Sequence, residues 1–167
     1  MKALQLVQPR IFERIDIPIP VLNKNTTEMI LVRTRWVSLC GSDISYFTGN
    51  KRYITYPLSA GAPIHESVGQ VIESQSKQFR PGDIVLAIPE GDLGLAEYYV
   101  AQAGKAIHMP EVLAICDDSC LIQPLSTVLN AVDQLGEIQG KSVAVIGLGS
   151  IGLFFCWLLK KRKAEYI

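Results

Sequence analysis

The chain has 167 residues, of which 49% are hydrophobic and 19% charged, and its 16 basic side chains balance 16 acidic ones. This length allows a full core, and the composition is not that of a disordered chain. Zero net charge leaves no basic field for a phosphate backbone, which argues against nucleic-acid binding. The four cysteines form no C-x-x-C pair, and Met1-Lys2 leads straight into a strand-like segment without a signal peptide. We therefore expect reduced thiols and a cytoplasmic location.

The first hundred residues predict a mainly β domain. Short runs rich in Val, Ile and Leu, typical of strands, alternate with turns rich in Pro and Gly. We expect strands at residues 2–7, 29–39, 65–73, 83–88 and 96–101. Many short strands with such turns predict a barrel or a sandwich.

After Pro110 the pattern becomes helical. Residues 117–135 have apolar residues at helical spacing, and Pro124 should break or kink this helix. Residues 141–146 (KSVAVI) predict a buried strand, and a second helix is expected over residues 153–163. The strand and the second helix are joined by the sequence GLGSIG.

This glycine-rich segment has the G-x-G-x-x-G spacing of a dinucleotide-binding turn between a strand and a helix. In such a turn Gly147 permits the tight bend, Gly149 lets the backbone approach a pyrophosphate, and Gly152 lets the helix pack closely. The free N–H groups of the helix N-terminus would face the anion. The predicted cofactor-binding residues are Gly147, Leu148, Gly149, Ser150, Ile151 and Gly152.

Two alternatives remain for this region. Glycine-rich turns between a strand and a helix also occur without a ligand. Residues 142–159 carry no charge and precede Lys160-Lys161-Arg162-Lys163, as in a short membrane helix with a positive flank. Three glycines and the β-branched run before them favour the strand.

An acidic residue for the ribose is expected about 20 residues beyond the glycines. The sequence ends at Ile167, before that position. We therefore expect the polypeptide to be a fragment or truncated product of a longer enzyme.

A second group of residues has the chemistry of a metal site. His65 is one of only two histidines, Glu66 follows it, and Cys40 lies 25 residues earlier. Thiolate, imidazole and carboxylate are all zinc ligands. Their wide spacing leaves open that Cys40 is a small core residue and that His65-Glu66 is a surface pair.

Five segments together resemble the medium-chain zinc-dependent alcohol and polyol dehydrogenases, and are most similar to the sorbitol and threonine dehydrogenase branch. They are residues 36–48 (WVSLCGSDISYFT), 61–73 (GAPIHESVGQVIE), 79–85 (FRPGDIV), 121–126 (LIQPLS) and 143–152 (VAVIGLGSIG). The resemblance implies a mainly β GroES-like catalytic domain over residues 1–125. Residues 126–167 would then form a linking helix and the first βα unit of an incomplete, α/β Rossmann-type dinucleotide-binding domain.

The resemblance also implies an activity, namely hydride transfer between a secondary alcohol or polyol and NAD or NADP. One catalytic zinc would be held by Cys40, His65 and Glu66. Ser42 would carry the proton of the substrate hydroxyl, and Asp43 would orient the histidine. It further implies a small-molecule alcohol or polyol substrate, and members of the family are commonly dimers or tetramers, which leaves the oligomeric state of this chain open. We expect neither nucleic acid nor membrane as partner.

The sequence departs from the family pattern at several positions. Ile64 replaces the usual glycine before His-Glu, Gln123 replaces a glutamate before Pro124, and Ser45 replaces a relay histidine. No cysteine lies between residues 83 and 109, so we expect no structural zinc. Two alternatives therefore stay open: a non-catalytic fragment, and a zinc-free reductase of the same fold. Packing roles are expected for Cys116, Cys120 and His108.

Overall fold

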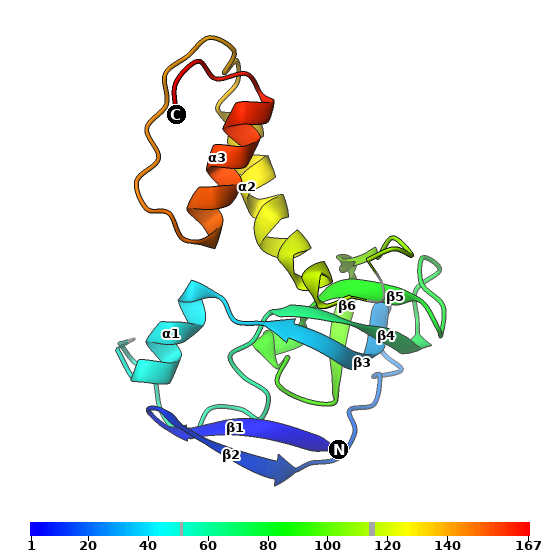
Figure 1. Cartoon of the computed structure of the whole chain (residues 1–167). Coiled ribbons are helices and arrows are strands. Elements are labelled where there is room, and N and C mark those ends of the chain that lie inside the picture. The colour runs from blue at the N-terminus through cyan, green and yellow to red at the C-terminus, as the bar shows by residue number, and fades with distance from the viewer. Residues whose placement is uncertain (51, 114–115) are drawn as a thin grey trace. The chain divides into compact units, whose positions relative to one another are not determined.

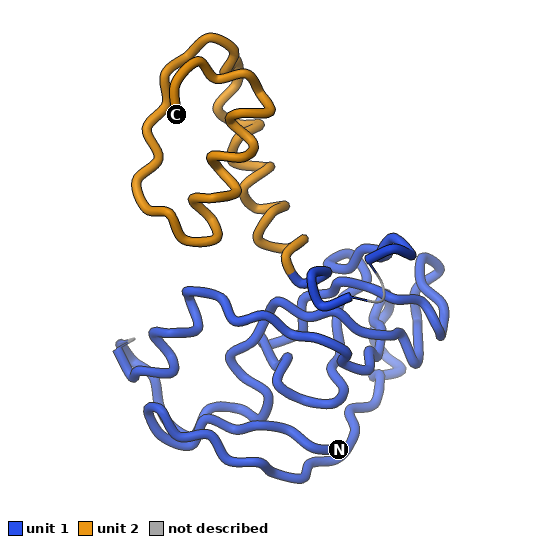
Figure 2. The backbone as a smooth tube through the Cα atoms, viewed as in Figure 1, with its two compact units in different colours: residues 1–120 blue, residues 121–167 orange. Residues whose placement is uncertain are grey.

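The computed structural model describes residues 1–50, 52–113 and 116–167. The chain divides into two compact units, Met1–Cys120 and Leu121–Ile167 (Figure 2). The first unit is mainly β and the second contains two helices.

A closed barrel forms the centre of the first unit. Its strands are β3 (Met29–Ser38), β4 (Glu66–Ser74), β5 (Ile84–Pro89) and β6 (Tyr98–His108) (Figure 1). All four pairings are antiparallel, and β3 lies between β4 and β6. Side chains alternate across a strand, so every second residue of β6, from Tyr99 to Ala103, points into the core. The buried cluster consists of Ile30, Val32, Val71, Phe79, Val85, Ala87, Tyr99, Ala101 and Ala103.

A two-stranded antiparallel sheet accompanies the barrel. It consists of β1 (Lys2–Gln8), which was predicted, and β2 (Ile11–Asp16), which was not. Strand β2 is almost wholly exposed, so no alternation of buried residues marks it in the sequence. Its conformation depends on its pairing with β1, which is a tertiary contact.

Three short helical segments follow or connect the strands of the first unit. Helix α1 (Gly41–Thr48) was not predicted, because it is only eight residues long and buries a single residue, Asp43. The 3₁₀ helices are η1 (Glu90–Asp92) and η2 (Asp117–Leu121). Segment η2 precedes the first helix of the second unit.

The second unit is built on α2 (Ile122–Gln134) and α3 (Ser150–Lys161), which pack side by side (Figure 1). Val128, Val132 and Leu158 form the buried contact. The expected break at Pro124 is not observed. Pro124 is the third residue of α2, in the first turn, where a backbone N–H has no intrahelical partner to lose.

The predicted strand over residues 141–146 is wrong for this structure. Only one parallel bridge forms, between Ser142 and Tyr166, with the Val143 N–H donating to the Tyr166 carbonyl at 2.9 Å. A strand needs hydrogen-bonded neighbours along its length, and Ile146 is fully exposed. Within the described residues, no helix is long and apolar enough to cross a membrane.

Candidate metal centre

Cys40 lies at the N-terminus of α1, where local hydrogen bonds hold its backbone. Its N–H donates to Oδ2 of Asp43 at 2.8 Å, and its carbonyl accepts the Asp43 N–H at 3.0 Å. Asp43 is the third helical residue, from which an acidic side chain can reach back to cap the helix start. This reciprocal pair holds the backbone of Cys40 at the beginning of the helix.

Strand pairing explains how residues 25 positions apart in the sequence come together. Glu66 begins β4 and is paired with Ser38, the last residue of β3. Cys40 follows Ser38 by two residues, and His65 directly precedes β4. The antiparallel register therefore places Cys40, His65 and Glu66 at one end of the barrel.

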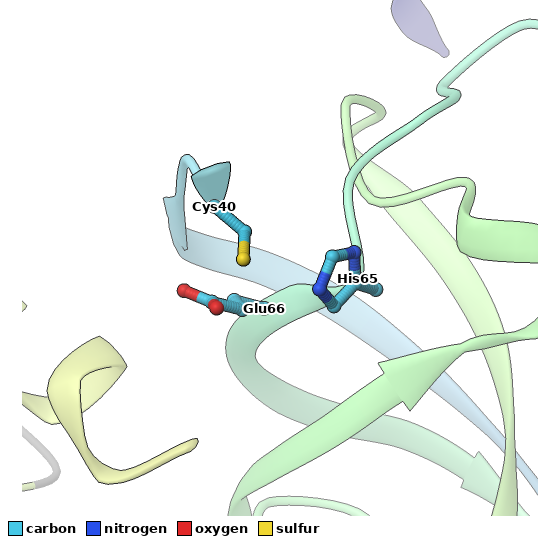
Figure 3. A group of neighbouring side chains, drawn as sticks. All are labelled: Cys40, His65 and Glu66. Atoms are coloured by element: carbon cyan, nitrogen blue, oxygen red, sulfur yellow. The ribbon is translucent and has the colours of Figure 1, made fainter. Parts of the chain in front are cut away.

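These three side chains form a compact cluster of potential metal ligands. One ligand atom from each lies within 4.8 Å of the other two. Figure 3 shows the Cys40 sulfur, the Glu66 carboxylate and a His65 ring nitrogen facing a common space. In the described part of the chain, no other group of three such residues has this spacing.

The donor set fits a zinc ion. Sulfur, nitrogen and oxygen are its usual protein ligands, and three protein ligands with one open position are typical of a catalytic site. Glu66 is only 3% exposed. A buried carboxylate without partners is costly unless a cation or donor compensates it.

Asp43 links the cluster to α1. Its Oδ1 lies 3.6 Å from Nδ1 of His65 and has no hydrogen-bond partner among the described residues. Burial raises the pKa of the Asp43 carboxyl, against the opposing effects of the Cys40 N–H and His65. A carboxylate at Nδ1 can orient the ring, leaving Nε2 as the nitrogen available to a metal.

Ser42, the other predicted catalytic residue, also lies on α1. Ser42 is exposed, and its carbonyl accepts the hydroxyl of Ser45 at 2.9 Å. The Ser45 hydroxyl thus has a local partner within the helix.

The predicted cofactor-binding turn lies in the second unit and has the expected backbone form. Gly147 has a φ of +95°, a region that favours glycine, and α3 begins at Ser150 immediately after Gly149. A Cβ at Gly152 would overlap the carbonyl oxygen of Gly147, whereas a Cβ at Gly149 would have no heavy atom within 4 Å. The third glycine is thus required sterically, and the second leaves open space beside the backbone.

The other residues singled out in the sequence have separate surroundings. The His108 ring packs against Phe79 with centroids 4.6 Å apart, and its Nε2 lies 3.0 Å from the Gln78 carbonyl oxygen. Cys120 is buried, which raises the pKa of its thiol, and Cys116 is half-buried. None of these three belongs to the metal-type cluster.

The sequence analysis missed two features of the site. One is α1, which positions Cys40 and Asp43 together. The other is an apolar pocket beside this helix. The spacing of Cys40, Asp43, Ile44 and Phe47 at i, i+3, i+4 and i+7 is the signal that could have indicated a helix face.

Comparison with known proteins agrees with the fold. The alcohol dehydrogenase GroES-like domain family matches residues 26–111. D-xylulose reductase A of Aspergillus niger is 28% identical over 184 residues, covering 91% of this chain and 50% of that protein. L-idonate 5-dehydrogenase (NAD(P)(+)) of Escherichia coli is 28% identical over 178 residues, covering 87% of this chain and 50% of that protein. The chain thus spans about half the length of these curated relatives.

A solved structure shows the same fold. Galactitol-1-phosphate dehydrogenase from Escherichia coli superposes with a TM-score of 0.83 at 22% identity, covering 99% of this chain and 54% of that one. The fold is that of a GroES-like barrel followed by the beginning of a Rossmann-type unit. The chain belongs to the zinc-type alcohol dehydrogenase family with a GroES-like domain, as the sequence motifs predicted.

Proposed function

We propose that this chain carries the N-terminal catalytic domain of a zinc-dependent alcohol or polyol dehydrogenase. The reaction is hydride transfer between a secondary alcohol and NAD or NADP. The observation that carries the proposal is the cluster of Cys40, His65 and Glu66 in a barrel of this family. Residues 1–125 form the catalytic domain, and residues 126–167 begin the nucleotide-binding domain.

Cys40, His65 and Glu66 hold the zinc in this proposal. Bound zinc supplies Lewis-acid polarisation of the substrate oxygen. Asp43 is a positioning residue, because its Oδ1 faces Nδ1 of His65 and keeps the ring in one orientation. The exposed hydroxyl of Ser42 accepts a hydrogen bond from the substrate hydroxyl and relays the proton, giving its own proton to solvent water.

The glycine turn binds the pyrophosphate of the nicotinamide cofactor. The open space at Gly149 and the N-terminus of α3 support this role, since backbone N–H groups can reach an anion there. The partner is a small alcohol or polyol, and we expect a homo-oligomer in the cytoplasm.

Zinc content of the purified chain tests the metal site without requiring turnover. We expect about one zinc per chain in the wild type, with most of it lost in Cys40→Ser, because a hydroxyl is a much weaker zinc ligand than a thiolate. Cys116→Ser is the matched control, since Cys116 is also a half-buried free cysteine of the first unit.

Retention of full zinc by Cys40→Ser would contradict the ligand assignment. Absence of zinc from wild type and both variants would instead favour a metal-free reductase of the same fold. Equal losses in Cys40→Ser and Cys116→Ser would point to zinc bound nonspecifically by thiols.

A further inference from the structure

A small apolar pocket lies beside α1 and shares one residue, Cys40, with the metal-type cluster. Three segments form it: β2, α1 with the two residues before it, and the residues before β4. Its hydrocarbon lining consists of Phe12, Leu39, Ile44, Phe47, Pro63 and Ile64. The Phe12 and Phe47 rings are stacked with centroids 6.0 Å apart and planes inclined by 14°.

The pocket and Ser42 occupy different faces of α1. Cys40, Asp43, Ile44 and Phe47 line the pocket and fall on one face at helical spacing. Ser42 precedes Ile44 by two residues, which places it about 160° around the helix axis from Ile44 and about 150° from the centre of that face. A molecule in the pocket therefore does not lie at the hydroxyl proposed to handle the substrate proton.

Few polar atoms line the pocket. One oxygen of Asp43 accepts the Cys40 N–H, and the other, which faces the imidazole of His65, is buried away from solvent. A ligand would therefore meet mainly hydrocarbon walls, with the Cys40 thiol as the one weakly polar side-chain group. Such a lining favours uncharged apolar molecules and rejects polyols, whose hydroxyl groups would lose their water.

Two of the apolar side chains that line the pocket are largely exposed. Leu39 is 77% exposed and Ile44 60% exposed. Covering these side chains would remove apolar area from water, which favours binding. The pocket volume is about 190 Å³, and the pocket is partly open to solvent. An enclosed apolar cavity of roughly 150 Å³ can hold one benzene molecule, so the volume here is sufficient for a single ring.

We propose that this pocket binds a small uncharged apolar molecule, a single aromatic ring or a short branched alkyl group, on the face of α1 opposite Ser42. Binding at this site does not require the zinc chemistry proposed above. An occupant would nevertheless contact Cys40, a proposed zinc ligand, and Asp43, the residue proposed to orient His65.

Methyl-resolved NMR of the full chain titrated with toluene tests the proposal, with sorbitol as the polar probe. We expect saturable shifts confined to the methyl groups of Leu39, Ile44 and Ile64, and none with sorbitol. Ile44→Asn should weaken toluene binding about fivefold or more, since part of the apolar wall is lost. Ile107→Asn is the matched control, because Ile107 is 51% exposed on β6 and lies outside the pocket.

Leu39→Asn provides a second variant outside the helix, in case Ile44→Asn disturbs folding. Methyl signals of the barrel core report the fold of each variant. Toluene shifts that do not saturate, or equal weakening by the Ile44 and Ile107 variants, would overturn the proposal. Shifts of Leu39 and Ile44 that change on dilution without ligand would also overturn it, because a second copy of the chain would then cover the pocket.

Discussion

The carboxylate of Asp43 connects two residues that belong to different elements. One oxygen accepts the backbone N–H of Cys40 at 2.8 Å, and the other lies 3.6 Å from Nδ1 of His65. The same side chain therefore caps α1 and faces the imidazole at the start of β4. A change at Asp43 should be felt both in helix stability and in the geometry of the proposed metal ligands.

Asp43→Asn should separate these two roles. The amide keeps an oxygen that can accept the Cys40 N–H, so the capping contact survives, whereas the negative charge beside His65 is lost. We expect zinc affinity to fall by about 10- to 100-fold, the usual effect of removing such an orienting partner. Competition with a zinc chelator measures the affinity, and circular dichroism checks the fold.

Asp83→Asn is a close control for this substitution. Asp83 also accepts a backbone N–H from three residues earlier, that of Arg80, and its carboxylate lies 3.9 Å from Nδ1 of the other histidine, His108. The Asp83 variant should retain the wild-type zinc affinity. Equal losses in the two variants would show that charge alone, and not the position beside His65, is responsible.

The structure of the glycine turn predicts a large loss of stability for one glycine substitution and little change for another nearby. Gly152→Ala should destabilise the second unit by about 3 kcal/mol, because its Cβ would overlap the Gly147 carbonyl oxygen. Gly149→Ala should change stability by less than about 1 kcal/mol, since φ is −73° and no heavy atom lies within 4 Å of the added carbon. Urea unfolding followed by tryptophan fluorescence measures both in a Trp36→Phe background, which leaves Trp157 as the single tryptophan. Equal effects of the two substitutions would refute the steric argument.

A similar comparison applies to the barrel. A Cβ at Gly69 in β4 would overlap the carbonyl oxygen of Arg33 on β3 and lie 2.6 Å from Cγ1 of Val32. Gly69→Ala should therefore cost about 3 kcal/mol or prevent folding. Gly104→Ala in β6, where nothing lies within 4 Å, should be tolerated. Thermal unfolding of the two variants tests whether close approach of β3 and β4 requires this glycine.

Tyr99 predicts a loss of stability at alkaline pH. Its hydroxyl is buried without a hydrogen-bond partner among the described residues, and burial raises the pKa of the phenol. The folded chain keeps the proton while the unfolded chain loses it above pH ~10, so stability is unaffected below that pH and falls above it. The loss contributed by Tyr99 approaches about 1.4 kcal/mol per pH unit.

Tyr99→Phe should remove this contribution to the pH dependence. It should also raise stability by about 1 kcal/mol at neutral pH, since no hydrogen bond is lost and an unpaired buried hydroxyl disappears. Urea unfolding at pH 8, 10 and 11 measures the difference from wild type. An unchanged slope above pH 10 in the variant would contradict the buried, protonated state of Tyr99.

The accuracy of the sequence predictions followed the range of the interactions involved. Strand β3 was predicted to within one residue, because a long run of Val, Ile and Leu marks a buried strand wherever it pairs. Strand β2 was missed, and the strand predicted over residues 141–146 does not form. The same physical reason explains both errors. Exposed residues form a strand when a neighbour supplies hydrogen bonds, and apolar residues fail to form one when it does not.

The sequence by itself determined the ligand chemistry and the backbone requirements of this protein. Cys40, His65 and Glu66 are zinc-type donors in any conformation, and the glycines at 147 and 152 satisfy positions where a side chain would be strained. Only the tertiary structure decided that the three donors meet, because their distance depends on the register of β3 with β4. The apolar pocket beside α1 also exists only in the tertiary structure. Its walls come from segments that are distant in the sequence, and no local sequence pattern shows that these segments pack together.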